Sequence, residues 1–470
     1  MIKHINLPGV TKTYAAVCSR GDDMEETNKL NGFLNDLEAV SGNYPENVIL
    51  KLKASLLDYL GVTIAGAKAF ENKTKTIIEN SNGDCSIIGV DATTSFENAI
   101  FVNGLHAHAL DFDDGTNHGI IHLGSPIFSV LLPLSKKYQV DWNRFVNAVL
   151  RGYEASFTLA ISLQPTHKSL GYHATGTCGT LGATLAISDL LEFSVSEKRN
   201  ALSTAAVSAT GSLKVLENDS ELKPYNVAKA SLMAYISATI GKAGFQGPVD
   251  AFSGYAGFLS MMVREEDRCL QKPLWNGTYA IEKTYFKPYA ACRYCHPAIE
   301  ASLQLRKEYS INPDEIEKID VRTYKWAVFN HDHTAVPNPA SAKMSIPYSV
   351  AVSLITGKAN LVEYNEEHVR NKNIIELTRK VCVSADEKMT EDFPKLTTAV
   401  VTILMKNGVC YEKRVDFPKG EPENPLSMEE VVDKFMSMAV FANYDLKNAE
   451  KIVDIVLSAE TRFDELFEFI

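Results

Sequence analysis

The interpretation of one glycine-rich stretch decides the fold: residues 171–193, GYHATGTCGTLGATLAISDLLEF. Gly176, Gly179 and Gly182 suggest a phosphate-binding loop, but their spacing matches neither nucleotide fingerprint, and the strand–helix–strand context of such loops is missing. Small residues three apart lie on one face of a helix, where they let a neighbouring helix approach closely. The stretch therefore predicts a tightly packed helix and not a nucleotide-binding loop.

The segments on the N-terminal side of this stretch also have helical periodicity. In residues 48–60, apolar side chains recur at helical spacing after Pro45, and Gly61 lies near the expected end of the helix. Residues 125–134 and 145–159 are similar apolar stretches. The first two-thirds of the chain is therefore expected to be mainly helical.

Beyond residue 280 the pattern changes to one that mixes strands with helices. Apolar and polar side chains alternate over residues 319–324, as in a half-buried strand. Residues 397–405 and 409–417 flank Asn-Gly at 407–408, the pair preferred in a type I′ hairpin turn. Two helical stretches are expected between these strands, at residues 347–355 and 366–383. This region is predicted to be α+β.

The C-terminal part is expected to return to helix. Ser427 and Glu430 have the spacing of a capping box, which opens a helix. The predicted fold class is mainly α with a second α+β domain. We expect an all-α domain over residues 30–281, an α+β domain over 282–418, and C-terminal helices over 419–470 that rejoin the first domain.

Composition limits the function classes. The chain has 470 residues, enough for two domains, and a net charge of −11. That charge argues against binding to nucleic acid or to an anionic membrane, but it leaves room for a small anionic substrate. Residues 1–17 lack a signal-peptide core, and no apolar run reaches the roughly 20 residues of a membrane helix. Eight irregularly spaced cysteines indicate reduced thiols, and so a cytoplasmic location.

Residues that titrate near neutral pH gather in one segment. Residues 103–126, NGLHAHALDFDDGTNHGIIHLGSP, hold four histidines and three aspartates, and His173 follows later. Imidazoles and carboxylates beside glycines suit acid–base catalysis. The alternative is structural: Asp113 and Asp114 would cap a helix, and His106 and His108 would be satisfied core histidines.

Two other functions fit individual motifs. His106, His108 and Asp111 are spaced almost as in the metal-binding loop of metallohydrolases, with one residue too many before the aspartate. A metal-dependent hydrolase is therefore the alternative hypothesis. Residues 292–296, CRYCH, match the attachment pattern of c-type haem, which requires export. A haem-bearing or scaffold protein without catalytic function is the third hypothesis.

Several segments together resemble the MmgE/PrpD family. They occur in family order from about residue 45 to the C-terminal region, whereas the residues before about 30 fall outside the resemblance. The segments are VNGLHAHALDFDDG, HLGSP, GYHATGTCGTLGATLA, KPYNVAKAS, GFQGPVDAFSGYAGF, KPYAACRYCHPAIEA, AKMSIPYSVAVSLITG and VDFPKGEPENPLS.

The resemblance implies a fold and a type of reaction. It implies an all-α domain built from both ends of the chain, a smaller α+β lid, a homodimer without a cofactor, and an active site between the domains. Family substrates are small di- and tricarboxylates, and family reactions include dehydration, decarboxylation and epimerisation. We therefore expect a lyase or isomerase that abstracts a proton α to a carboxylate.

The resemblance also implies a set of site residues. Those expected to be catalytic are Asp111, His122, His173 and His296. Those expected to bind substrate are Lys223, Lys287, Arg293 and Tyr348. Departures from the family pattern are Leu123 for a proline, Thr116 and Asn117 for histidine and arginine, and Leu232 for a lysine of the decarboxylase branch. The choice between dehydration, decarboxylation and epimerisation stays open, as does which histidine is the base.

Overall fold

The structure is a computed structural model, and the residues it describes are 28–38, 42–217, 220–264, 268–274 and 277–470. The prediction that residues 1–17 lack a signal-peptide core concerns residues outside these ranges. The helices up to residue 262 are α1 (Lys29–Glu38), α2 (Glu46–Ala69), α3 (Glu71–Ile78), α4 (Phe96–His108), α5 (Gly124–Tyr138), α6 (Trp142–Leu163), α7 (Thr166–Ser169), α8 (Ala174–Leu190), α9 (Val195–Ser208), α10 (Lys223–Lys242) and α11 (Phe258–Met262).

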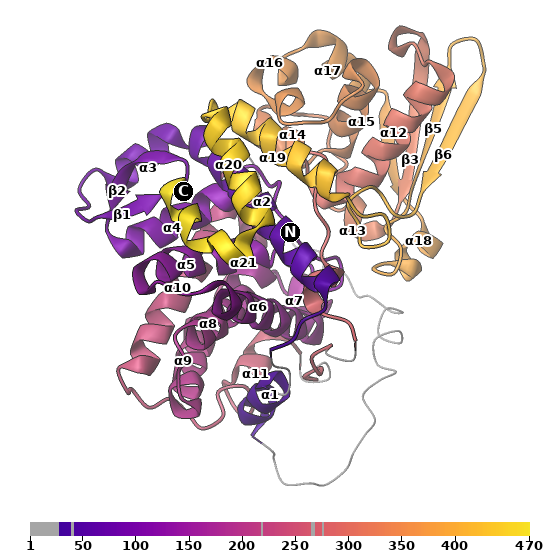
Figure 1. Ribbon diagram of the computed structural model, residues 1–470. Helices are drawn as coiled ribbons and strands as arrows, with labels where there is room; N and C mark the ends of the chain where they lie inside the picture. The colour runs from indigo at the N-terminus through magenta and orange to yellow at the C-terminus, as the bar shows by residue number, and fades with distance from the viewer. Residues whose placement is uncertain (1–27, 39–41, 218–219, 265–267, 275–276) are drawn as a thin grey trace.

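The later elements are helices and a four-stranded sheet. The helices are α12 (His296–Tyr309), α13 (Lys325–Val328), α14 (Pro339–Lys343), α15 (Ile346–Thr356), α16 (Glu366–Val369), α17 (Lys372–Thr378), α18 (Glu387–Asp392), α19 (Met428–Ala442), α20 (Leu446–Leu457) and α21 (Ala459–Arg462). The strands are β3 (Ile316–Thr323), β4 (Val381–Ala385), β5 (Ala399–Met405) and β6 (Cys410–Val415), after an earlier hairpin of β1 (Cys85–Ile87) and β2 (Val90–Thr94). The predicted fold class, mainly helical with a smaller α+β part, is confirmed (Figure 1).

The glycine-rich stretch forms α8, as predicted, and it lies at the centre of the helical part. Helix α8 packs against α5, α6, α9 and α10. A Cβ atom added at Gly182 would come 2.7 Å from the carbonyl oxygen of Gly152 on α6. One added at Gly176 would come 2.7 Å from the carbonyl oxygen of Thr210. Glycine is therefore needed at both positions for close packing.

The strands beyond residue 280 form one sheet in the order β4-β3-β5-β6. Strand β3 pairs in parallel with β4 and antiparallel with β5, and the predicted hairpin pairs β5 with β6. The predicted type I′ turn is wrong. Gly408 alone of the two turn residues has a positive φ, 86°, and its amide donates to the carbonyl of Met405 at 2.9 Å. That bond closes a four-residue turn from Met405 to Gly408, in which Asn407 keeps a negative φ.

Two sequence-based helix boundaries also differ from the structure. Helix α2 runs eight residues past Gly61 to Ala69, and that glycine lies inside the helix where it faces Phe435 of α19. The helix predicted for residues 366–383 is divided into α16 and α17, and its last part is β4. The Asn371 side chain accepts hydrogen bonds from the first backbone amides of α17 and starts a new helix, while pairing with β3 turns residues 381–385 into a strand.

The C-terminal helices return to the helical part of the molecule. Helix α19 packs along α2, and Figure 1 shows α19 and α20 crossing back over it. Lys434 of α19 donates to the Asp58 carboxylate of α2 at 2.6 Å and to the carbonyl of Phe112 at 2.8 Å. One apolar core contains residues from α1, α2, α4–α6 and α8–α11 together with α19 and α20, and a second core lies mostly in residues 290–415. The exact domain boundaries stay a prediction.

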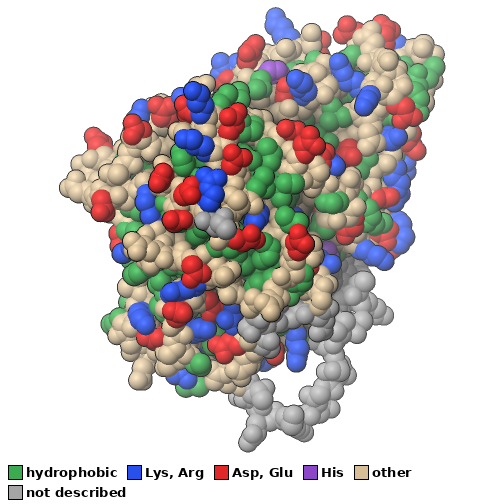
Figure 2. All heavy atoms as spheres, viewed as in Figure 1, with side chains coloured by type: hydrophobic (Ala, Val, Ile, Leu, Met, Phe, Trp, Pro, Cys, Tyr) green, Lys and Arg blue, Asp and Glu red, His purple; other side chains and the backbone are tan. Residues whose placement is uncertain are grey.

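Acidic and basic side chains are interspersed over the described residues on the face seen in Figure 2. Among the described residues, no helix is both long and apolar enough to cross a bilayer.

Candidate active site

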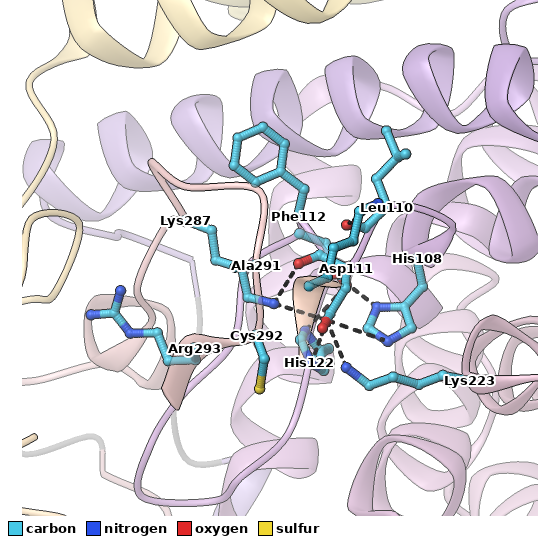
Figure 3. A network of polar contacts seen from close by, with 12 residues as sticks. His108, Leu110, Asp111, Phe112, His122, Lys223, Lys287, Ala291, Cys292 and Arg293 are labelled. Atoms are coloured by element: carbon cyan, nitrogen blue, oxygen red, sulfur yellow. Dashed lines mark hydrogen bonds and ion pairs between the residues drawn. The ribbon is translucent and has the colours of Figure 1, made fainter. Parts of the chain in front are cut away.

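Asp111 lies at the centre of a buried network of charged groups, in the loop that follows α4 (Figure 3). Its backbone φ is 51°, a left-handed conformation that aspartate tolerates better than most residues. Its Oδ1 accepts hydrogen bonds from Lys223 at 2.6 Å and Lys287 at 2.9 Å. Lys287 also donates to the Asp111 carbonyl at 2.6 Å. Figure 3 shows the two ammonium groups approaching this carboxylate from different sides.

The charges of this network support one another. Burial alone would raise the pKa of the Asp111 carboxyl, but Lys223 and Lys287 outweigh burial and hold that pKa well below its ordinary value. Burial would likewise lower the pKa of Lys223, but Asp111 reverses the effect and raises it. Two ammonium ions therefore share the single carboxylate of Asp111, and the excess positive charge among these three groups favours an anionic ligand.

Two histidines flank this network and share Asp113. His122 donates from Nδ1 to the carbonyl of Asp114 at 2.7 Å, and this nitrogen lies 3.3 Å from the Asp113 carboxylate. His108 uses its own Nδ1 to bond the other oxygen of Asp113 at 2.8 Å. The His122 Nε2 lies 4.0 Å from Oδ1 of Asp111. Hydrogen bonding at Nδ1 thus fixes the His122 ring with Nε2 facing the network.

His173 completes the group of imidazoles. It is the residue before α8, and its backbone amide donates to the carbonyl of Gly211 at 3.1 Å. Its ring centroid lies 6.5 Å from that of His108. Burial, and then the charge of Lys223, holds the pKa of His173 well below its ordinary value. The imidazole is therefore neutral at neutral pH and can accept a proton.

These groups open into a cavity of about 650 Å³, here called the main cavity. Residues of the helical part and of residues 282–418 line it together. They include His122, Lys168, His173, Lys223, Lys287, Cys292, Arg293, Tyr294 and His331. A second cavity of about 770 Å³ shares Lys223 with the first and is also lined by His108, Asp111 and Lys343.

Some groups in and around the main cavity were not among the predicted catalytic or substrate-binding residues. Lys168 donates to the hydroxyl of Tyr294 and lies 5.3 Å from the ring centroid of Trp326. Burial lowers the pKa of Lys168 to about 8. His108 had a structural alternative on sequence grounds, yet it contacts both Asp113 and the His122 ring. Cys292 and His331 also line the cavity, and only the fold brings them together.

Three predicted site residues have other surroundings. His296 lines neither cavity; its Nδ1 accepts from Arg293 at 2.9 Å and its Nε2 donates to the carbonyl of Ala291 at 3.1 Å. Arg293 lines the main cavity, but it also donates from Nε to the Glu421 carboxylate at 3.0 Å. Tyr348 is buried away from both cavities, and its hydroxyl donates to the Glu363 carbonyl at 2.7 Å.

The predicted metal set is not brought together among the described residues. His106 bonds Thr74 through Nε2 at 2.7 Å and belongs to no group of possible ligands. A different group, His108, Asp111, Asp113 and His122, has ligand atoms within 4.8 Å of one another. In that group, the Asp111 carboxylate already forms ion pairs with the ammonium groups of Lys223 and Lys287, and these would repel a divalent cation. These four residues are therefore better explained as partners of the two lysines than as ligands of a metal ion.

The chain is similar to several known proteins. The chain is similar to a cis-aconitate decarboxylase of Mus musculus, 28% identical and covering 84% of this chain and 83% of the relative. It is similar to a cis-aconitate decarboxylase of Homo sapiens, 25% identical over 89% of each chain. It is also similar to a 2-methylcitrate dehydratase of Escherichia coli (strain K12), 23% identical over 59% of this chain and 60% of the relative.

Family models cover most of the chain. Residues 35–271 match the MmgE/PrpD N-terminal domain, and residues 289–460 match the MmgE/PrpD C-terminal domain. The N-terminal match includes Asp111, Lys223 and the imidazole group, whereas Lys287 lies between the two matches. The chain therefore belongs to the MmgE/PrpD family.

Proposed function

We propose that the protein is a lyase that works without a cofactor and forms a carbanion next to a carboxylate of a small di- or tricarboxylate. The observation that carries the proposal is the meeting of Lys223, Lys287, His122 and His173 at one cavity. A proton α to a carboxylate is weakly acidic, so its removal needs a base and cations that stabilise the enediolate. The main cavity offers both.

The ammonium groups are suited to hold the substrate. Lys223 and Lys287 share one carboxylate, so together they keep one net positive charge for a bound anion. Lys168 adds a third ammonium on the wall formed with Tyr294. The cavity volume of about 650 Å³ is ample for a tricarboxylate. We assign Asp111 a positioning role, because its low pKa and its two cationic partners make it a poor base.

We assign His173 as the base and His122 as the acid. His173 lines the main cavity as a neutral imidazole, because burial and Lys223 disfavour its charged form. A substrate anion bound to Lys223 would offset the charge of that ammonium and so raise the proton affinity of His173 during the reaction. His122 is fixed by the hydrogen bond from its Nδ1 to the Asp114 carbonyl, which leaves its Nε2 facing the network. In a dehydration, His173 would remove the α proton and His122 would protonate the departing hydroxyl. In a decarboxylation, carbon dioxide leaves and one imidazole protonates the carbanion.

The predicted roles of three residues change in this proposal. His296 becomes a positioning residue, because it contacts Arg293 and lines neither cavity. Arg293 donates from Nε to the Glu421 carboxylate, so part of its guanidinium is already occupied and only the rest is available to a ligand in the cavity. Tyr348 stabilises the packing of α15 through its bond to Glu363.

The named relatives suggest the first substrates to test. Cis-aconitate comes first, because the relatives named for it cover most of this chain. Leu232 stands where the decarboxylase branch has a lysine, which keeps 2-methylcitrate dehydration as a second candidate and epimerisation as a third. Proton NMR on purified protein in heavy water, with a panel of di- and tricarboxylates, distinguishes them. Loss of carbon dioxide, loss of water, or exchange without net conversion identifies each reaction.

The same preparation tests the metal hypothesis. The proposal expects full activity after exhaustive chelation and dialysis. Activity that disappears on chelation and returns with stoichiometric zinc or iron would support the metal-dependent alternative instead.

A further inference from the structure

Cys292 and His331 form a pair on the wall of the main cavity. The Cys292 sulfur lies 3.4 Å from Nε2 of His331. The other ring nitrogen of His331 donates to the carbonyl of Phe329 at 2.7 Å. Because Nδ1 carries that proton, Nε2 has a lone pair to accept the proton of the thiol. This is the arrangement that converts a thiol into a thiolate beside an imidazolium.

The position of the thiol is fixed by the backbone around it. The amide of Cys292 donates to the carbonyl of Lys343 at 2.8 Å. Cys292 as a whole is only 8% exposed. His331 is 3% exposed, and the edge of the Tyr294 ring packs against it with centroids 5.2 Å apart. Both members of the pair nevertheless line the main cavity. Figure 3 places Cys292 on the loop that also carries Ala291 and Arg293.

The surrounding charges favour the thiolate. Burial alone would raise the pKa of the Cys292 thiol, but the charge and hydrogen bond of His331 outweigh burial and lower the pKa to about 6. Asp111 opposes this effect and Lys223 assists it. The other titratable groups that interact with the thiol are Lys168, Cys295 and the tyrosines Tyr285, Tyr294 and Tyr324.

The inference concerns covalent chemistry at this pair. We propose that Cys292, paired with His331, is a nucleophilic thiol that forms covalent adducts with small carboxylates bearing an electrophilic carbon. The ammonium groups of the main cavity would concentrate such anions beside the sulfur. With an α-halo acid, the thiolate forms a sulfur–carbon bond while the carbon–halogen bond breaks. The halide leaves with the bonding electrons, and the thiol proton stays on the His331 imidazolium. The proposal goes beyond the lyase reaction and does not depend on it.

The experiment compares iodoacetate with the neutral iodoacetamide. Each reagent is given to the folded, full-length protein, and the rate of labelling at each cysteine is followed by peptide mass spectrometry. The exposed Cys382 and Cys410 serve as references within the same chain. The iodoacetate-to-iodoacetamide rate ratio should be at least about tenfold higher at Cys292 than at the references, because of these three cysteines Cys292 is the one that lines the cavity with its cations. Cys292→Ser confirms the assignment of the labelled peptide.

The pH dependence tests the pairing with His331. Labelling of Cys292 should rise with pH and be half-maximal near pH 6, following the pKa of about 6. In the urea-unfolded chain the midpoint should move to about 8.5, the value of a free thiol. His331→Gln removes the proton acceptor and should raise the midpoint in the folded protein by at least about one pH unit.

Two results would overturn the proposal. One is a Cys292 midpoint above about pH 8 in the folded wild type, the range of an ordinary thiol. The other is a rate ratio at Cys292 no higher than at Cys382 and Cys410. Both measurements need only the wild-type protein, so they stand even when His331→Gln does not fold. Neither requires turnover, so failure here leaves the proposed lyase reaction untouched.

Discussion

Replacement of His173 by glutamine isolates the proposed base. The buried Nδ1 of His173 has no hydrogen-bond partner among the described residues, so the change removes little bonding from the fold. It does remove the neutral imidazole that lies beside Lys223 and the His108 and His122 rings. Glutamine has similar length and polarity but cannot accept and release a proton near neutral pH. The variant should therefore fold normally and lose catalysis.

The expected loss follows from the role of a general base. Positioned acid–base groups contribute about 10²–10⁴-fold in rate. Each factor of ten is about 1.36 kcal/mol, so His173→Gln should raise the activation barrier by about 2.7–5.4 kcal/mol. His108 cannot replace the missing base, because its Nδ1 is bonded to Asp113 and it does not line the main cavity. Stability should change by less than about 1 kcal/mol.

The assay needs a matched buried histidine as its control. His167 is fully buried, with Nδ1 bonded to the Met262 carbonyl at 3.0 Å and Nε2 to Thr177 at 2.8 Å, and it lines neither cavity. His167→Gln should lose about 1–3 kcal/mol of stability and keep its kcat. Both variants are measured on the substrate that the NMR panel identifies, alongside urea unfolding. A His173→Gln enzyme with kcat within threefold of wild type would refute the assignment of the base.

Four further outcomes are expected. Burial lowers the pKa of Lys168 to about 8, so its ammonium is charged below that pH; KM should rise as pH increases through 8, and Lys168→Met should remove this limb of the profile. Lys223→Met should raise KM by roughly tenfold or more, measured by initial rates, because a hydrogen bond to a charged group contributes about 1.5–3 kcal/mol. Lys434→Met should lower the free energy of unfolding by about 3–5 kcal/mol in urea titrations, since the buried Asp58 carboxylate loses its partner; Asp58→Asn in the same chain should recover part of the loss. Light scattering should report the predicted homodimer, and a monomer at micromolar concentration would contradict that prediction.

Local chemistry made much of the fold predictable. The apolar spacing after Pro45, the glycines of α8 and the Ser427 capping box each act within one helix or its immediate contacts, and each is confirmed. The failures arose where distant contacts decide the outcome. Residues 381–385 form a strand because they pair with β3, and their own sequence does not show that β3 lies beside them.

The candidate site could be predicted to a similar degree. Motifs indicated Asp111, His122, His173, Lys223 and Lys287, and the fold brings these five together. Motifs could not show that His296 would contact Arg293 and lie away from both cavities. The pairing of Cys292 with His331 joins residues 39 apart in the chain, and only the packed structure reveals it. The cytoplasmic location stays a prediction.

The central claim is spatial: imidazoles from the helical part and ammonium groups surround one pocket for an anion. A crystal structure with propane-1,2,3-tricarboxylate, a saturated tricarboxylate, tests this claim most directly. Our account predicts ligand carboxylates within about 2.6–3.2 Å of the Lys223 and Lys287 ammonium groups, with the carbon chain facing His173 and His122. A ligand bound outside the main cavity, or a His173 ring turned away from its carbon chain, would contradict it.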